Sequence, residues 1–226
     1  MTTRAVNRKT GTKGVPRSER EQLIVVAAIA EFSKATYAGA SLASIAAHVG
    51  VSKTLIISYF GSKESVYVAC VTRLGAQVAE AVADALTTPD HLTGSGVAAG
   101  EPVLAAIFAT FENRPGDWHV LFDRSVPDGP ARDAARRQRT MLREQAFSAV
   151  SRSLGALGLT DQSDLGAATV VWEHMVSGLM LWWRRHPAES AAAMAARARR
   201  ILAAMAGQAP HDSPGKRKRA APTSGS

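Results

Sequence analysis

The chain has 226 residues, 46% of them hydrophobic, and its 27 Lys and Arg outnumber its 19 Asp and Glu, which gives a net charge of +8. This length allows one large domain, or a small domain joined to a medium one. We expect neither a membrane span, because no run of about 18 apolar residues is uninterrupted, nor a secretory signal. A single cysteine, Cys70, excludes an internal disulfide and fits a reducing cytoplasm.

The positive charge is concentrated at the two ends of the chain. Residues 1–63 hold nine Lys and Arg and three acids, residues 64–206 hold fourteen and fifteen, and residues 207–226 hold four and one. The net charges of these segments are therefore +6, −1 and +3. A module that binds a polyanion, joined to a neutral body, would have this distribution.

Residues 1–17 are predicted to form a disordered basic arm, because they hold five cations, no acid and several helix breakers. This arm either only aids solubility or adds phosphate or minor-groove contacts beside a DNA reader. A first helix is expected from about Ser18 to Lys34.

The segment 41–60 has the pattern of a helix-turn-helix motif. Ser41 is a good N-cap for a helix that ends at Gly50, whose backbone freedom allows a sharp exit. Ser52 can cap the next helix, over Lys53–Phe60, which carries polar groups on one side. A recognition helix needs one side packed in the core and another that can meet base edges in the major groove.

In this segment and its flanking residues, the chain resembles the TetR family of bacterial transcriptional regulators. The resemblance covers about a fifth of the chain, ungapped and in order, and it rests on Ile24, Ala27, Ala28, Phe32, Tyr37, Ser41-Leu42, Ile45-Ala46, Gly50-Val51-Ser52-Lys53 and Tyr59-Phe60-Gly61-Ser62-Lys63-Glu64. It implies a three-helix DNA-binding domain at residues 18–78, a helical ligand-binding and dimerisation domain at residues 79–206, and a homodimer. Ile57 replaces the aromatic residue that is common in the family's recognition helix; it could meet a thymine methyl or simply pack.

The resemblance also implies which residues contact DNA. Tyr59 and Lys63 match positions that bind backbone phosphates, and Lys53, Thr54 and Ser58 lie where family members touch bases or nearby phosphates. The full predicted set is Ser41, Ser44, Ser52, Lys53, Thr54, Ile57, Ser58, Tyr59 and Lys63. Because one three-helix reader contacts few base pairs, two copies are expected on a palindromic operator, with half-sites about 34–36 Å apart or a multiple of that.

The rest of the chain predicts further helices and no strand, so the fold class is all-α. A fourth helix should begin at Ser62–Glu64 and run to about Leu86, and residues 87–100 should form a loop. Helices then follow at about 103–114, at 118–122, from Pro130 until Gly155 and Gly158, from Thr160 or Ser163 to about His186, and from Pro187 to about Gly207. Residues 207–226, with four consecutive cations at 216–219, are expected to be a disordered basic tail that tethers the protein loosely to DNA.

The last two of these helices, at about 163–186 and 188–206, are expected to form the dimer interface that the family places there. The first is apolar on more than one side: Leu165, Ala168, Trp172, Met175, Leu179 and Trp183 form one stripe, and Val171, Gly178, Leu181 and Trp182 lie elsewhere. An ordinary monomer core is the alternative.

A pocket for a small-molecule inducer, mostly apolar or aromatic, is expected between the helices of the body. Its candidate lining is Phe108, Phe111, Trp118, Phe122, Met141, Trp172 and Met175, although such residues at helical spacing are also typical of plain core. The same composition leaves open a DNA-binding or architectural protein without an effector. An enzyme is disfavoured, since the six histidines are scattered and there is no glycine-rich phosphate loop or metal-ligand spacing. Neither a cofactor nor a metal is expected, and the location should be the bacterial cytoplasm, at the nucleoid.

Overall fold

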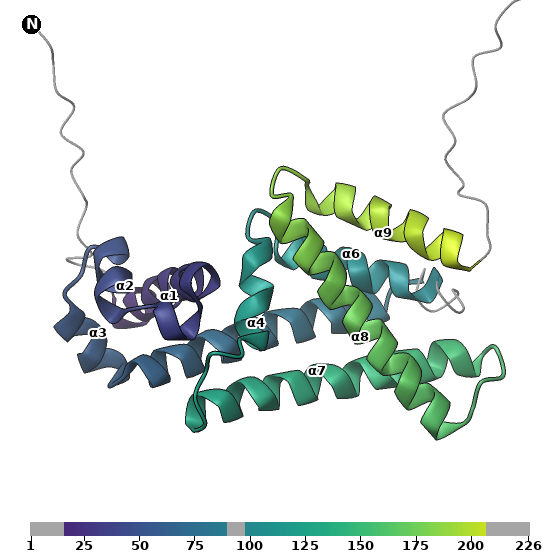
Figure 1. Cartoon of the computed structure of the whole chain (residues 1–226), viewed down its shortest axis with the longest axis horizontal. Coiled ribbons are helices and arrows are strands. Elements are labelled where there is room, and N and C mark those ends of the chain that lie inside the picture. The colour runs from purple at the N-terminus through teal and green to yellow at the C-terminus, as the bar shows by residue number, and fades with distance from the viewer. Residues whose placement is uncertain (1–15, 90–97, 207–226) are drawn as a thin grey trace, which may run out of the picture.

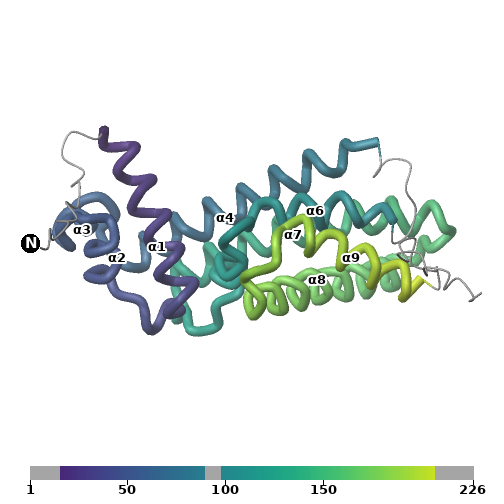
Figure 2. Tube along the Cα trace, turned by 90° about the horizontal axis from the view of Figure 1, so that it is seen from above, coloured from purple at the N-terminus to yellow at the C-terminus, as the bar shows by residue number. Residues whose placement is uncertain are grey.

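The structure, a computed structural model, describes residues 16–89 and 98–206 and is helical throughout that part of the chain. The elements are α1 (Arg17–Gly39), α2 (Leu42–Val49), α3 (Lys53–Phe60), α4 (Lys63–Leu86), η1 (Ala98–Gly100), α6 (Glu101–Thr110), η2 (Pro115–Phe122), α7 (Pro130–Gly155), α8 (Gln162–Arg185) and α9 (Ala191–Met205). Helices α1 to α3 form a group at one end, and α4 runs from this group along the whole body (Figure 1). The view from above shows the same elongated arrangement (Figure 2). The N-terminal arm up to residue 15, the tail and most of the loop at 87–100 lie outside the described residues.

The helix-turn-helix forms as the sequence predicts, because its turns are set by local hydrogen bonds. The Ser41 hydroxyl accepts a hydrogen bond from the Ser44 amide at the start of α2. Gly50 ends that helix with φ 75°, a left-handed conformation that favours glycine. The chain then bends by 107° between α2 and α3, within the range of about 90–120° that such motifs show.

The first helix is longer than predicted and is kinked near its end. It runs to Gly39 rather than Lys34, but Thr36 breaks its regular geometry with φ 60° and ψ 173°. This region is almost unused by residues with a side chain, so the backbone is strained there. Beyond the kink the Tyr37 ring stacks on Phe32 at 5.9 Å and meets Tyr67 of α4 edge-on at 5.2 Å. The strain is thus offset by aromatic packing that turns the end of α1 toward the body.

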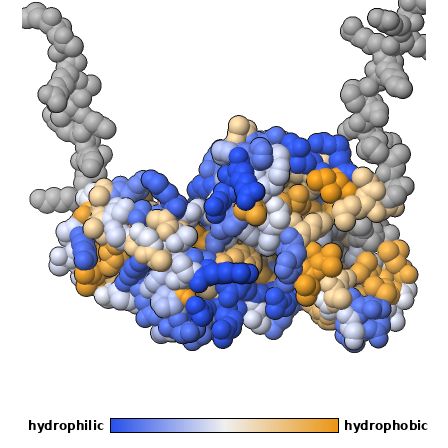
Figure 3. Space-filling model, viewed as in Figure 1, coloured by the Kyte–Doolittle hydropathy of each residue, from blue (hydrophilic) through white to orange (hydrophobic). Residues whose placement is uncertain are grey.

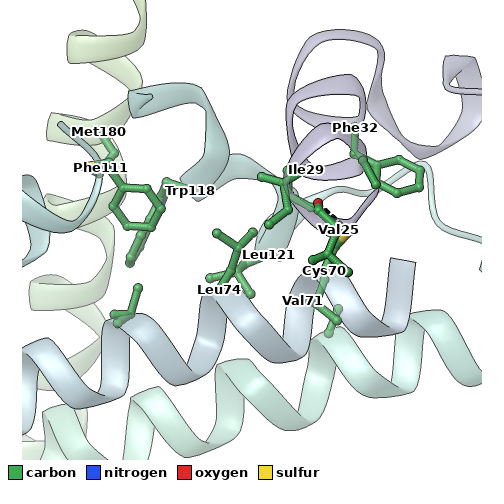
Figure 4. Packing of buried hydrophobic residues seen from close by; sticks show 14 of the residues in the cluster. Val25, Ile29, Phe32, Cys70, Val71, Leu74, Phe111, Trp118, Leu121 and Met180 are labelled. Atoms are coloured by element: carbon green, nitrogen blue, oxygen red, sulfur yellow. Dashed lines mark hydrogen bonds between the residues drawn. The ribbon is translucent and has the colours of Figure 1, made fainter. Parts of the chain in front are cut away.

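Helix α4 is the core helix that joins the two parts of the molecule. It packs against α1, α6 and α7, and Figure 4 shows its residue Cys70 beside Val25 of α1 and its residue Leu74 beside Leu121 of η2. The Cys70 thiol is fully buried, lies 3.7 Å from the Val25 carbonyl oxygen, and has its pKa raised by burial. This is the environment of an inert core thiol. By length and composition alone α4 could cross a membrane, but 44% of its most apolar window is buried inside the fold.

Two helix starts in the body differ from the prediction. Asp161, not Thr160 or Ser163, caps α8, and its carboxylate accepts hydrogen bonds from the amides of Ser163 and Asp164. The last helix begins at Ala191 with Ser190 as its cap, so Pro187 lies in the preceding turn and does not start the helix. A hydroxyl or carboxylate that reaches the first free amides stabilises a helix start directly.

The buried face of α8 is rotated relative to the predicted stripe. The residues with at most 4% exposure are Leu165, Thr169, Val176, Met180 and Trp183, whereas Trp172, Met175 and Leu179 are only half-buried. Val170, Val171 and Leu181 are exposed by 46%, 66% and 37%. Helix α8 therefore keeps an apolar face that residues 16–89 and 98–206 do not cover, and apolar side chains gather on the half of the surface away from α1–α3 (Figure 3).

Candidate nucleic-acid interface and internal cavity

The outer side of α3 presents four of the side chains that were predicted to contact DNA. Lys53, Thr54, Ile57 and Ser58 are all exposed, and their positions bring them together on one face of the helix. Ile56, on the opposite face, is fully buried. The helical period thus separates a buried face of α3 from an exposed one. The exposed face is a short surface of polar and apolar side chains at one end of the molecule.

The remaining predicted serines hold local structure. The Ser52 hydroxyl accepts a hydrogen bond from the Leu55 amide at 3.1 Å. Ser44 donates its hydroxyl to the Glu31 carboxylate at 2.8 Å, which ties α2 to α1, while Ser41 caps α2. These exposed hydroxyls can therefore only supplement the contacts of the α3 face.

Tyr59 lies within a group of cations. Its hydroxyl accepts a hydrogen bond from Nη1 of Arg20 at 2.7 Å, and the Arg17 guanidinium lies 4.9 Å from the centre of its ring. Sequence reasoning had assigned Arg17 to a disordered arm and had given Arg20 no role. The spacing of Arg17 and Arg20, which places them on one side of the first helical turns, was the signal that could have identified them.

Lys63 occupies the first turn of α4, with Ser62 as the N-cap. Its Nζ atom lies 4.6 Å from the centre of the Tyr37 ring, so the ammonium group is positioned by a cation–π contact. The positive end of the α4 dipole and the Lys63 charge together make this helix start attractive to a phosphate. Arg17 and Arg20 of α1 thus lie beside Tyr59 of α3, and Lys63 follows α3 in the chain at the start of α4.

Two hydrogen bonds link the end of α1 to the segment that follows η2. The Tyr37 amide donates to Oδ2 of Asp123 at 2.5 Å, and the Ala38 amide donates to the Ser125 hydroxyl at 3.0 Å. Asp123 also accepts hydrogen bonds from the amide and the hydroxyl of Ser125. Both amides directly follow the kink at Thr36, so the strained backbone lies at the junction of the two parts.

A third link joins α4 to η2. The buried Tyr67 hydroxyl donates to the Val120 carbonyl oxygen at 2.5 Å. Burial and the nearby Asp123 charge raise the pKa of Tyr67. Both α1 and α4 are therefore bonded to η2 or to the residues directly after it.

Two titratable groups of η2 are shifted by burial. Burial raises the pKa of the Asp117 carboxyl, and Arg114 and a hydrogen bond from Ser33 partly oppose this. Burial and the charge of Arg184 lower the pKa of His119. Within residues 16–89 and 98–206, no group of His, Cys, Asp and Glu could hold a metal ion.

A cavity of about 290 Å³ lies in the body between α4, η2, α6, α7, α8 and α9. Four of the predicted lining residues, Trp118, Phe122, Trp172 and Met175, do line it. Its size is near the lower end of about 300–1,000 Å³ that is usual for small-molecule sites. The residues that line the cavity include Val82, Trp118, Phe122, Arg139, Leu142, Arg143, Leu154, Trp172, Glu173, Leu202 and Met205.

Three predicted lining residues are not part of the cavity. Phe108 is fully buried and packs edge-on against Trp183, and Phe111 is 1% exposed and packs edge-on against Trp118. Met141 is 38% exposed on the outer side of α7. The wall is mostly apolar, as expected for the inducer pocket, and its charged residues are Arg139, Arg143 and Glu173.

The family model for bacterial regulatory proteins of the tetR family matches residues 24–70. Among solved structures, a TetR-like transcriptional regulator from Rhodococcus sp. RHA1 is similar at 22% identity and a TM-score of 0.65, over 86% of this chain and 100% of that one. The TetR family regulator PfmR from Thermus thermophilus is similar at 20% identity and a TM-score of 0.62, over 81% and 95%.

The transcriptional regulator FadR from Bacillus subtilis, solved in complex with stearoyl-CoA, is similar at 14% identity and a TM-score of 0.59, over 80% of this chain and 95% of that one. No curated protein matches the sequence. The likeness to these structures covers both the three-helix end and the helical body, in agreement with the all-α architecture. The match at residues 24–70 and the exposed recognition helix thus show that the chain carries the DNA-binding region of the bacterial regulatory proteins of the tetR family, on the fold of TetR regulators.

Proposed function

We propose that the chain is a homodimeric repressor in the bacterial cytoplasm that binds a palindromic operator at the nucleoid and is released by a small molecule. The observation that carries the proposal is the exposed face of α3, with Lys53, Thr54 and Ile57 turned outward beside the cations of α1 and α4. This face has the dimensions and chemistry of a major-groove reader.

Lys53 and Thr54 at the start of α3 reach base edges, and Ile57 lies against a thymine methyl. Tyr59, held by Arg20, and Lys63, held over Tyr37, contact phosphates on either side. The phosphate contacts position the domain, and the contacts of α3 choose the sequence.

The DNA part of the proposal is tested by selecting duplexes from a random pool and measuring their affinity across salt concentrations. Lys53→Ala should weaken binding to the selected duplex about 5- to 150-fold, since a side chain at a base edge contributes about 1–3 kcal/mol. Lys34→Ala is the matched control, because Lys34 is exposed on α1 about 21 Å along the helix from Arg20. Equal effects of the two substitutions would contradict the assignment of α3.

The exposed apolar face of α8 supports a dimer. Val170, Val171 and Leu181 are exposed there, beside the small residues Ala167 and Gly178, and α9 adds Ile201 and Met205 with 41% and 73% exposure. Small residues allow helices of two subunits to approach closely, and a contiguous apolar face on a soluble chain marks an interface.

Sedimentation at micromolar concentration tests the dimer. Leu181→Glu should convert dimer to monomer, because it places an unpaired charge in an apolar interface. Leu157→Glu should leave the dimer intact, because Leu157 is 61% exposed in the turn between α7 and α8, away from the α8 face. A wild-type chain that sediments as a monomer would contradict the proposal.

Release by a ligand follows from the links between the cavity and the DNA-binding helices. Trp118 and Phe122 of η2 line the cavity, while Asp123, the next residue, holds the Tyr37 amide of α1. A ligand that displaces η2 would therefore move α1 as well as α4, and so change the separation of the two recognition helices. The stearoyl-CoA complex of the FadR relative supports a ligand with a large apolar part in a body of this fold.

A further inference from the structure

The wall of the cavity carries an uncompensated positive charge. Three charged residues belong to the wall, namely Arg139, Arg143 and Glu173. Arg143 and Glu173 neutralise each other through three hydrogen bonds of 2.9–3.2 Å. Arg139 has no carboxylate partner within the described part of the chain.

The Arg139 guanidinium is fixed in place but keeps unused hydrogen-bond donors. Its Nη1 group donates to the Leu121 carbonyl oxygen at 2.5 Å, and the Phe122 ring centre lies 6.0 Å away. No other acceptor for this guanidinium is present among residues 16–89 and 98–206. Burial is the main cause that lowers the pKa of Arg139, and the charges of Arg136, Arg143 and Arg132 add to it. An anion beside this side chain would therefore offset both its desolvation and the repulsion.

A second unused donor lies in the same part of the wall. Trp118 packs against Phe122 with ring centres 5.2 Å apart, and its buried indole N–H has no acceptor in the described segments. A buried donor without a partner is destabilising by about 1–3 kcal/mol. An acceptor supplied by a ligand would satisfy it after a small movement of the ring.

Beyond Arg139 the cavity follows α7, and its wall is mostly apolar, although Gln145, Ser153 and the paired Arg143 and Glu173 also belong to it. The α7 wall continues from Arg139 through Leu142 to Leu154, a distance of about 22 Å at 1.5 Å per residue. Val82 of α4 and Leu202 and Met205 of α9 line the same space. Such a channel suits an extended hydrocarbon chain better than a compact ring system.

We propose that the cavity binds a free carboxylic acid with an unbranched hydrocarbon chain, whose carboxylate is held by Arg139 and whose chain extends along α7 toward α9. The assignment of this ligand as the effector rests on the proposed function. The planar guanidinium can donate two parallel hydrogen bonds to a carboxylate, which an ester, an alcohol or an amine cannot accept in the same way. A cavity of about 290 Å³ holds a chain of medium length.

The test measures binding of decanoate, methyl decanoate and decylamine to the purified full chain without DNA. Trp118 and Trp172 line the cavity, so their fluorescence reports occupancy, and calorimetry gives the affinity. Decanoate should bind at least tenfold more tightly than the other two compounds. Equal or tighter binding of the ester or the amine would overturn the proposal, and so would the absence of decanoate binding.

Two substitutions on α7 locate the head group. Arg139→Gln should weaken decanoate binding at least tenfold while leaving the affinity for methyl decanoate unchanged. Arg137→Gln should change neither, because Arg137 is exposed and outside the cavity wall. If both substitutions have the same effect, the carboxylate is not bound at Arg139. If Arg139→Gln fails to fold, the comparison of the three ligands on the wild-type chain decides alone.

The outcomes separate this inference from the proposed function. Decanoate that binds through Arg139 but never releases the selected duplex would refute induction and leave the ligand site standing. Release of the duplex by uncharged compounds alone, without decanoate binding, would refute the ligand class and leave the repressor function standing.

Discussion

The link between Asp123 and the end of α1 provides a quantitative test of how the two parts of the molecule are joined. Asp123→Ala removes the acceptor of the Tyr37 amide and also frees Ser125, whose hydroxyl holds the Ala38 amide. A hydrogen bond to a charged group contributes about 1.5–3 kcal/mol when it is buried, and Asp123 is half-buried. Together the losses should lower the free energy of unfolding by about 2–3 kcal/mol, a factor of roughly 30–150 in the folding equilibrium.

Urea unfolding and amide hydrogen exchange measure this effect. Exchange of the Tyr37 and Ala38 amides should become faster in Asp123→Ala, because Tyr37 loses its acceptor and the Ser125 hydroxyl, which accepts from Ala38, loses the bond that holds it. Asp123→Asn keeps one acceptor oxygen without the charge, so an intermediate loss is expected. Asp128→Ala is the control: its carboxylate pairs with Arg132, but the Asp128 side chain is 88% exposed, so the change should stay within about 0.5 kcal/mol. If Asp123→Ala behaves like this control and exchange is unchanged, the two links do not join the parts in solution.

Three further substitutions test the strained kink, the buried histidine and the DNA-facing cations. Thr36→Gly should raise the free energy of unfolding in urea by about 1 kcal/mol, because glycine tolerates the φ of 60°. A lower free energy of unfolding would show that the backbone at Thr36 is not strained. Burial and Arg184 lower the pKa of His119 below 6.5, so the unfolded chain takes up a proton first. The stability that His119 contributes is therefore present above about pH 6.5 and is lost as the pH falls. In His119→Gln the urea midpoint should depend less on pH between 5.5 and 7.5. A variant whose midpoint changes with pH as in the wild type would contradict this. Arg17→Ala should reduce the salt dependence of DNA affinity by about one phosphate contact, whereas the control Lys34→Ala should not, and identical slopes would remove Arg17 from the interface.

The part of the fold that could be predicted from the sequence is the part that depends on neighbouring residues. The starts of α2, α3 and α4 follow from hydroxyls that bond amides three residues later, at Ser41, Ser52 and Ser62. Gly50 ends α2 with the positive φ that its lack of a side chain allows. The exposed α3 face follows from the same local order, since one buried residue, Ile56, fixes the orientation of the helix.

The body was predicted less well, because apolar composition does not state which face of a helix its neighbours cover. Phe108 and Phe111 have the same residue type and spacing as a ligand wall, yet they fill the core against Trp183 and Trp118. Arg139, in a segment rich in arginine, gave no sign that it would face a cavity.

The sequence by itself determined the limits of α2 and α3, the all-helical class and the separation of charge, because each of these rests on contacts within about one helical turn or on composition. Only the tertiary structure decided the cavity wall, the exposed α8 face and the bond from Tyr37 to Asp123. Tyr37 and Asp123 are 86 residues apart. Their meeting depends on how whole helices cross and pack, and no local pattern encodes that geometry.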